Sequence, residues 1–143
     1  MTTDDLNESP WTLQDALIAL MVSTSVSDAR VRTLELLSIQ RVVDHLPIFA
    51  SYDADRMTII SQTVFDILED EDGLDALFGL VRAAMPEKFN ETAYALCCDV
   101  AAADGLLREG ELRFLEEIRY ELFIDRLAGA AIERGARARH QKA

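Results

Sequence analysis

Apolar residues recur along this chain at intervals of three and four residues, the spacing of one face of an α-helix. The pattern predicts seven helices, with breaks at Pro47, at Asp72-Gly73 and at Pro86. The expected ranges are about 12–26, 32–46, 51–68, 74–85, 87–103, 108–122 and from 125 onward. No stretch alternates with a period of two, so no strands are expected. We therefore predict an all-α fold, a single compact bundle of about seven helices with short connections.

Two helix hairpins repeat each other along the chain. When the sequence is displaced by 76 residues, LMVSTSVSDARVRTLELLSI at 20–39 aligns with LCCDVAAADGLLREGELRFL at 96–115. Both copies read Asp, two variable residues, an aliphatic residue, Arg, two more residues and Glu. Two copies are too few for a solenoid. The repeat predicts a duplicated hairpin with an internal pseudo-two-fold relation inside the bundle.

Helical spacing predicts where the acids of the two copies point. Asp28 and Asp104 extend mostly apolar stripes at the ends of their helices, and Glu35 and Glu111 begin stripes on the next helices. Each hairpin is therefore expected to aim one carboxylate from each helix inward at its turn. An ionised carboxylate in a low-dielectric site needs Arg, backbone N–H groups or a cation beside it. The stripes are Leu17-Met21-Thr24, Ala93-Cys97-Val100, Ile39-Val42-Leu46 and Leu115-Ile118-Leu122.

The spacing of these acids does not match an EF-hand. An EF-hand has acids at positions one, three and five, Gly at six and Glu at twelve. Here Gly105 follows Asp104 immediately, and Glu111 comes seven residues after that Asp. A divalent cation between the carboxylates of the two turns remains one interpretation, because hard cations need several oxygen ligands.

Two structural interpretations stand beside the cation. The acids could cap the turns, with the glutamates as the third residue of a capping box. The N-cap positions then fall on Arg32 and Arg108, and Arg is a poor N-cap. Alternatively, the same two arginines pair with the acids, and the Asp–Arg–Glu cluster only locks each hairpin.

The composition limits the number of domains and the kinds of partner that the chain can have. Half of the 143 residues are hydrophobic, which is enough for one core. There are 26 acids against 14 bases, and the net charge of −12 repels phosphate backbones, so no nucleic-acid partner is expected. Six acids crowd into DILEDEDGLD at 66–75 and predict a solvated helix end, whereas RGARARHQKA at the end of the chain is basic. We expect an N-terminal tail over 1–10, the helical domain over 11–132, and a basic C-terminal helix end or tail over 133–143.

The opening MTTDDLNESPW has no basic region or cleavage-like site of a signal peptide, and no apolar run approaches the roughly 20 residues of a membrane-spanning helix. We therefore expect a cytoplasmic protein that does not span a membrane. The adjacent Cys97 and Cys98 would diverge by about 100° on a helix, so they are expected to be buried small hydrophobes.

Other catalytic or metal-binding arrangements are not evident in the sequence. His45 and His140 are far apart, so no zinc set is predicted. Ser and Thr are scattered, and no nucleophile–base pair is recognisable, so no enzyme is expected. Four aromatic residues lie on apolar stripes and are expected in the core: Phe65, Phe78, Phe114 and Phe123.

The doubled motif resembles the tellurite-resistance TerB-like family. VAAADGLLREGELRFL, with its upstream echo VSTSVSDARVRTLELLSI, carries the likeness, which covers roughly 11–127. The resemblance implies a bacterial all-helical stress-response domain with internal pseudo-symmetry and no established catalytic reaction. It also implies one acidic patch, proposed in the family to bind metal, which would hold a divalent cation (Ca, Mg, Mn or Zn). Carried over by position, the ligands are Asp28, Glu35, Asp104 and Glu111.

This chain departs from the family where Ala29 stands in place of the frequent Gly, and where Arg occupies both cap positions. Domains of this family also occur attached to co-chaperone and membrane-associated proteins, so a protein partner is expected. The alternative function is a structural protein-interaction module whose carboxylates pair with Arg and hold no metal.

Overall fold

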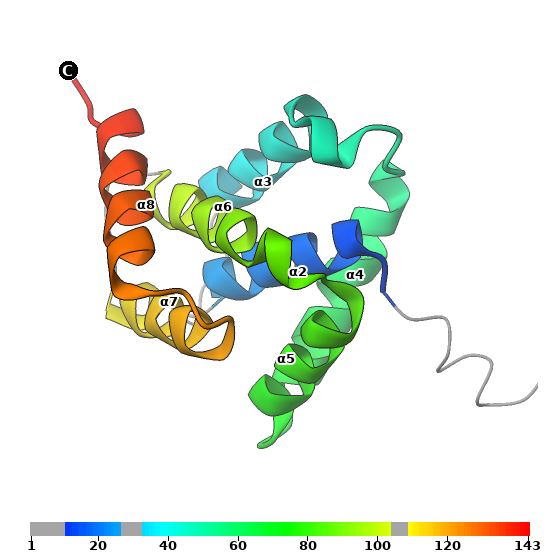
Figure 1. The fold of residues 1–143 in the computed structure, drawn as a ribbon. Coiled ribbons are helices and arrows are strands. Elements are labelled where there is room, and N and C mark those ends of the chain that lie inside the picture. Colours follow the sequence, from blue (N-terminus) through cyan, green and yellow to red (C-terminus); the bar gives the residue numbers. More distant parts are fainter. Residues whose placement is uncertain (1–10, 27–32, 104–108) are drawn as a thin grey trace, which may run out of the picture.

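The fold is known from a computed structural model that describes residues 11–26, 33–103 and 109–143. These residues form seven α-helices and two short 3₁₀ helices, without strands in the described part of the chain (Figure 1). The prediction of an all-α bundle of about seven helices is confirmed. The elements are α2 (Leu13–Val26), α3 (Thr33–His45), η1 (Pro47–Phe49), α4 (Ala54–Leu68), α5 (Gly73–Ala84), η2 (Glu87–Phe89), α6 (Asn90–Ala102), α7 (Glu109–Glu121) and α8 (Arg126–Arg139).

Local capping explains where the observed helices depart from the expected ranges. The third helix begins at Ala54 rather than at 51, because the carboxylate of Asp53 accepts a hydrogen bond from the Asp55 N–H and caps α4 there. Ser51, just before it, has a left-handed backbone with φ of 65°. The fifth helix opens with the separate 3₁₀ turn η2 before α6 begins.

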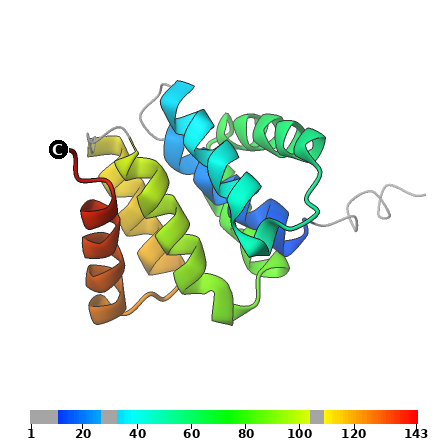
Figure 2. The same ribbon diagram turned by 90° about the horizontal axis from the view of Figure 1, so that it is seen from above.

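Helix α2 forms the centre of the bundle. Every residue from Asp15 to Ser25 is buried, because α2 is contacted by α3, α4, α5, α6 and α7. Figures 1 and 2 both show α2 and α6 side by side and running in the same direction. Since a helix that is apolar on every face must be covered all round, this position follows from the sequence of α2.

The second helices of the two hairpins, α3 and α7, have the same length. Helices α3 and α7 begin 76 residues apart and end 76 residues apart, the displacement that aligns the two sequence copies. The Asn90 side chain donates to the Leu122 carbonyl, so the start of α6 lies beside the end of α7. Because α2 and α6 run in parallel, the C-terminal ends of both helices lie at the same end of the molecule (Figure 2).

Helix α8 packs along α6 in the same direction, and it contains the start of the basic C-terminal segment. It continues without interruption through 132 to Arg139, and Ala136 is buried. The Arg139 guanidinium donates to the Asp99 carboxylate at 2.7 and 3.1 Å, and the His140 ring lies 3.3 Å from the same oxygen. The start of the basic segment is therefore packed on α6 as part of the bundle.

The interior contains two of the four aromatic side chains expected there. Phe78 and Phe114 are buried and stacked, with ring centroids 6.1 Å apart, whereas Phe65 is half-buried. The expectation for Phe123 is wrong, since its side chain is 84% exposed. Helix α7 ends before it, and φ of 55° at Phe123 turns the backbone into the left-handed region and carries the side chain outward.

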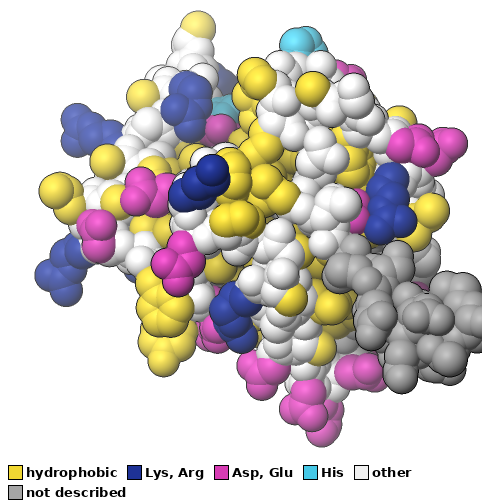
Figure 3. All heavy atoms as spheres, turned by 45° about the vertical axis from the view of Figure 1, so that its right-hand side comes forward, with side chains coloured by type: hydrophobic (Ala, Val, Ile, Leu, Met, Phe, Trp, Pro, Cys, Tyr) yellow, Lys and Arg dark blue, Asp and Glu magenta, His cyan; other side chains and the backbone are white. Residues whose placement is uncertain are grey.

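Acidic side chains gather where α4 meets α5. Glu69, Asp70, Glu71 and Asp72 are all exposed there. Figure 3 shows acidic side chains along the lower edge of the molecule, below most of the hydrophobic surface. The prediction of a solvated helix end at 66–75 is confirmed. None of the described helices combines the length and the apolar character of a membrane span.

Candidate functional site

Buried polar side chains concentrate where the two hairpins turn. Among the described residues, five polar or charged side chains are buried, and Asp15 is the one at the start of α2. The other four lie in the last turn of α2 or the first turn of α7, and we call this region the turn end: Ser23, Thr24, Ser25 and Glu111. Four buried polar groups in one part of an otherwise apolar core make the turn end the candidate site.

Glu111 points inward, as its helical spacing predicts. Its side chain is fully buried, and the stripe that follows it is buried as well, at Leu115 and Ile118 on α7 and at Leu122 just after it. A buried ionised carboxylate is costly unless cations or hydrogen-bond donors surround it. This position is therefore suited to a charged or polar contact at the turn end.

The last turn of α2 lines the same region with hydroxyl groups. The hydroxyls of Ser23, Thr24 and Ser25 donate to the carbonyl four residues earlier, at 2.7, 2.8 and 3.3 Å. Such bonds occupy the hydroxyl hydrogens and leave the oxygens facing their surroundings. Thr24 was expected on an inward stripe, but Ser23 and Ser25 were missed. The signal for them was the run STS inside an otherwise apolar helix.

The other predicted ligands are not described to the same extent. Asp28 and Asp104 lie outside the described residues, and so do Arg32 and Arg108. Glu35 lies on α3, but its side chain is outside the described set. Within the described side chains, no three His, Cys, Asp or Glu groups converge on a point that could hold a metal ion.

No protein-family model, curated protein or solved structure matches this chain. The likeness to the TerB-like family therefore stays a prediction that rests on the doubled sequence motif.

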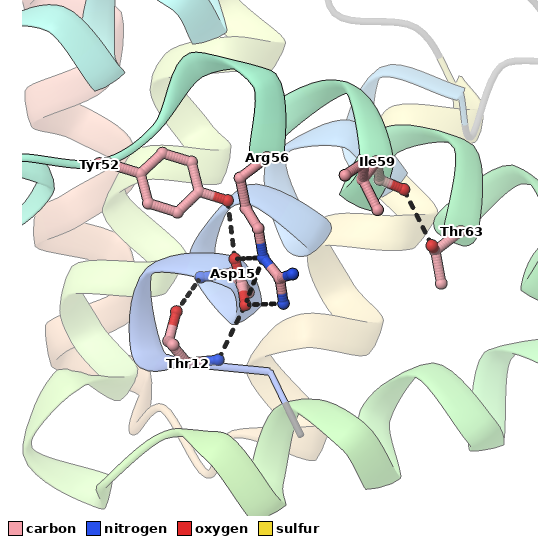
Figure 4. Close-up of polar contacts among 6 residues, drawn as sticks. All are labelled: Thr12, Asp15, Tyr52, Arg56, Ile59 and Thr63. Atoms are coloured by element: carbon pink, nitrogen blue, oxygen red, sulfur yellow. Dashed lines mark hydrogen bonds and ion pairs between the residues drawn. The ribbon is translucent and has the colours of Figure 1, made fainter. Parts of the chain in front are cut away.

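A second buried carboxylate, that of Asp15, shows how this fold can satisfy such a group (Figure 4). The Thr12 N–H donates to Asp15 at 2.9 Å, and the Asp15 N–H donates to the Thr12 hydroxyl at 3.1 Å, and these two bonds form a capping box at the start of α2. The Tyr52 hydroxyl donates at 2.7 Å, and Arg56 donates through Nη2 at 2.9 Å and through Nε at 3.2 and 3.3 Å.

These contacts determine which groups in the cluster are charged. Burial acts to raise the pKa of Asp15, but the hydrogen bonds from Arg56, the Thr12 backbone and Tyr52, with the Arg56 charge, lower the pKa overall. Burial and donation to Asp15 raise the pKa of Tyr52, and the bond to Asp15 raises that of Arg56. The cluster is therefore an ion pair with a neutral phenol, and it joins α2 to α4.

A pocket of about 150 Å³ lies between α6, α7 and α8. One wall carries a three-residue network, in which the Tyr94 hydroxyl and the Arg119 guanidinium both donate to Glu133. Cys98 also lines this pocket, and burial raises its pKa to about 12. A thiol with so high a pKa holds almost no thiolate near neutral pH, so Cys98 is unsuited to nucleophilic catalysis. The expectation that both cysteines are buried is confirmed.

Proposed function

We propose that this chain is a non-enzymatic, cytoplasmic stress-response domain of the TerB-like kind, and that its turn end binds a divalent cation. The observation that carries the proposal is the full burial of Glu111 at the end of the molecule where both hairpins turn. In this proposal, the cation is bound by the carboxylates of Asp28, Glu35, Asp104 and Glu111. The resemblance also leads us to propose a protein partner for the domain.

The arrangement of the helices supports a joint site. Because α2 and α6 run in parallel, their C-terminal ends lie together, and both turns start from that end. In our proposal, carboxylates from both sequence copies then bind one ion. Hard cations such as Ca²⁺, Mg²⁺ and Mn²⁺ take six or more oxygens, which carboxylates, hydroxyls and water supply together. Zn²⁺ takes fewer ligands, so it is the other cation to test.

Calorimetric titration with each of the four cations tests this proposal. The native protein should release or absorb heat with at least one of them, and the Glu35→Gln, Glu111→Gln double variant should not. Gln keeps the size of Glu, and circular dichroism establishes whether the variant is folded. Glu117→Gln is the matched control, because Glu117 is exposed on the same helix as Glu111. Silence of the native protein with all four cations would overturn cation binding.

The second candidate function is a structural interaction module whose carboxylates are locked by arginine and hold no metal. The ion pair of Asp15 favours it, because that fully buried carboxylate is neutralised by Arg56 without any ion. In this case Arg32 and Arg108 pair with the acids of the turns. The Arg32→Gln, Arg108→Gln double variant should then unfold at lower urea concentration, and the native protein should give no heat with cations. Unchanged unfolding of that variant would reject the locking role.

A further inference from the structure

Three large apolar side chains are almost fully exposed where α7 meets α8. The exposed fractions are 78% for Tyr120, 84% for Phe123 and 81% for Leu127. The next most exposed large hydrophobic side chain among the described residues is that of Ile59, at 55%. We call the three residues the aromatic corner. Large exposed apolar side chains gathered on one short segment of chain are typical of interaction sites.

The backbone at Phe123 adds an independent observation. The Phe123 N–H donates to the Tyr120 carbonyl and the Ile124 N–H donates to the Arg119 carbonyl, which together form a Schellman motif at the end of α7. The left-handed position of this motif is usually Gly, because a Cβ is unfavourable there. Phe123 takes that position with φ of 55° and an exposed side chain. It adds little burial within the monomer to offset the unfavourable backbone, which points to a contact outside the monomer.

Each aromatic side chain lies beside a hollow in the surface. Tyr120 lines one hollow of about 270 Å³, and Phe123 lines another of about 350 Å³. Ile124 lines both, so the two hollows are neighbours. A protruding ring next to a hollow is the shape that a self-complementary contact needs, because a two-fold axis presents the same patch on both subunits.

The residues that line the two hollows carry net charges of opposite sign. The Tyr120 hollow is lined by two bases and one acid, and the Phe123 hollow by two acids and one base. When a second copy approaches about a two-fold axis, the basic hollow of each copy can face the acidic hollow of the other. The chain as a whole carries a net charge of −12, whereas these six lining charges, three acids and three bases, sum to zero, so the two hollows do not add to the repulsion between two copies. The charged lining residues are Glu116, Arg119 and Arg126 in the first hollow, and Glu87, Lys88 and Glu91 in the second.

We propose that the aromatic corner is the docking surface for a second copy of this chain, in a two-fold symmetric dimer. Phe123 and Tyr120 of each copy insert into the hollows of the other, and the charged rims pair across the contact. This surface lies at the end of α7, away from the turn end at its start, so the proposal stands whether or not a cation binds.

Sedimentation equilibrium of the full chain, across micromolar and millimolar concentrations, tests the proposal. The native protein should pass from the monomer mass to the dimer mass as concentration rises. Phe123→Gly should raise the dissociation constant at least about tenfold, because truncating a central aromatic anchor has effects of that size or more. Tyr120→Gln should act in the same direction. High salt should also raise the dissociation constant, since the rims pair through charges.

Two measurements separate loss of the contact from loss of the fold. Gly suits the left-handed position, so Phe123→Gly should unfold at the same or a higher urea concentration than the native chain, compared where both are monomeric. Ile59→Gln is the control, because Ile59 is exposed on α4 and outside the corner, and its dissociation constant should equal the native value. A monomer mass at every concentration would overturn the proposal. A dimer that is insensitive to both corner variants would overturn it as well.

Discussion

The guanidinium of Arg56 on α4 lies 2.9 Å from the carboxylate of Asp15 on α2, across 41 positions of sequence. Asp15 is fully buried, and Arg56 is partly exposed. The Tyr52 hydroxyl approaches the same carboxylate from the segment that leads into α4. This contact fixes the position of α4 against the central helix through a polar cluster rather than through apolar packing alone.

Replacing Arg56 should destabilise the fold. Arg56→Ala leaves the buried Asp15 with only the Tyr52 hydroxyl and the Thr12 N–H as donors, and we expect a loss of about 2 kcal/mol in the free energy of unfolding. The value is below that for a fully buried pair, because water can reach the side of Asp15 that Arg56 vacates. Tyr52→Phe should cost about 1 kcal/mol. Urea unfolding measures both changes.

Arg134→Ala is the matched control for these variants. Arg134 is exposed on α8, so its loss should change the free energy of unfolding by less than about 0.5 kcal/mol. Equal effects of Arg56→Ala and Arg134→Ala would show that the Asp15 cluster does not stabilise the fold.

The same cluster predicts a pH dependence of stability. The pKa of Asp15 is lower in the folded chain than the ordinary value of 3.8. The folded protein therefore keeps this carboxylate charged at pH values where the unfolded chain takes up a proton, and the contribution is lost as pH falls from about 3.8 through the folded pKa. We expect the difference in stability between native protein and Asp15→Asn to be full at neutral pH and to shrink below pH 3.8. A difference that stays constant down to pH 2 would contradict this linkage.

The start of α2 shows how far the sequence determines such a cluster. Thr12 and Asp15 are three residues apart, so their reciprocal capping bonds follow from local spacing. Arg56 and Tyr52 are 41 and 37 positions from Asp15. Which distant side chain meets a buried acid depends on how the helices pack, and no local pattern carries that information.

The two hairpins were also predictable from local sequence patterns, whereas the orientation of Phe123 was not. Periodicity and the prolines predicted the helices within a few residues, and the repeat predicted the equal lengths of α3 and α7. The outward turn of Phe123 was not predictable, because the rule for a left-handed helix end expects Gly and an apolar stripe expects burial. At the candidate site, the inward direction of Glu111 followed from its stripe. The convergence of all four acids stays a prediction.

Two glycines of α5 should respond in opposite ways to the same substitution. A Cβ added at Gly73 would lie 2.1 Å from the Ile67 carbonyl oxygen, a backbone atom that cannot move aside. We expect Gly73→Ala to lower the free energy of unfolding by about 3 kcal/mol. At Gly79 a Cβ meets no atom within 4 Å, and the position is exposed in mid-helix. Gly79→Ala should therefore raise the free energy of unfolding by about 0.5–1 kcal/mol. Thermal or urea unfolding of the pair measures the contrast, and a shift of both variants in the same direction would contradict it.

The two cysteines should be unreactive until the protein unfolds. Cys97 and Cys98 are buried, and burial raises the pKa of each thiol to about 12. At pH 8 almost none of either thiol is then ionised, and the thiolate is the species that attacks a disulfide reagent. An aromatic disulfide reagent should react slowly with the native protein, at a rate that increases with urea. Both thiols should react at once in the unfolded chain, which provides the stoichiometric control. Cys98→Ala then reports on Cys97 alone, which should be the slower thiol, because Cys98 lines the pocket between α6, α7 and α8. Rapid reaction of either thiol in the native protein would show that water and reagent enter this part of the core.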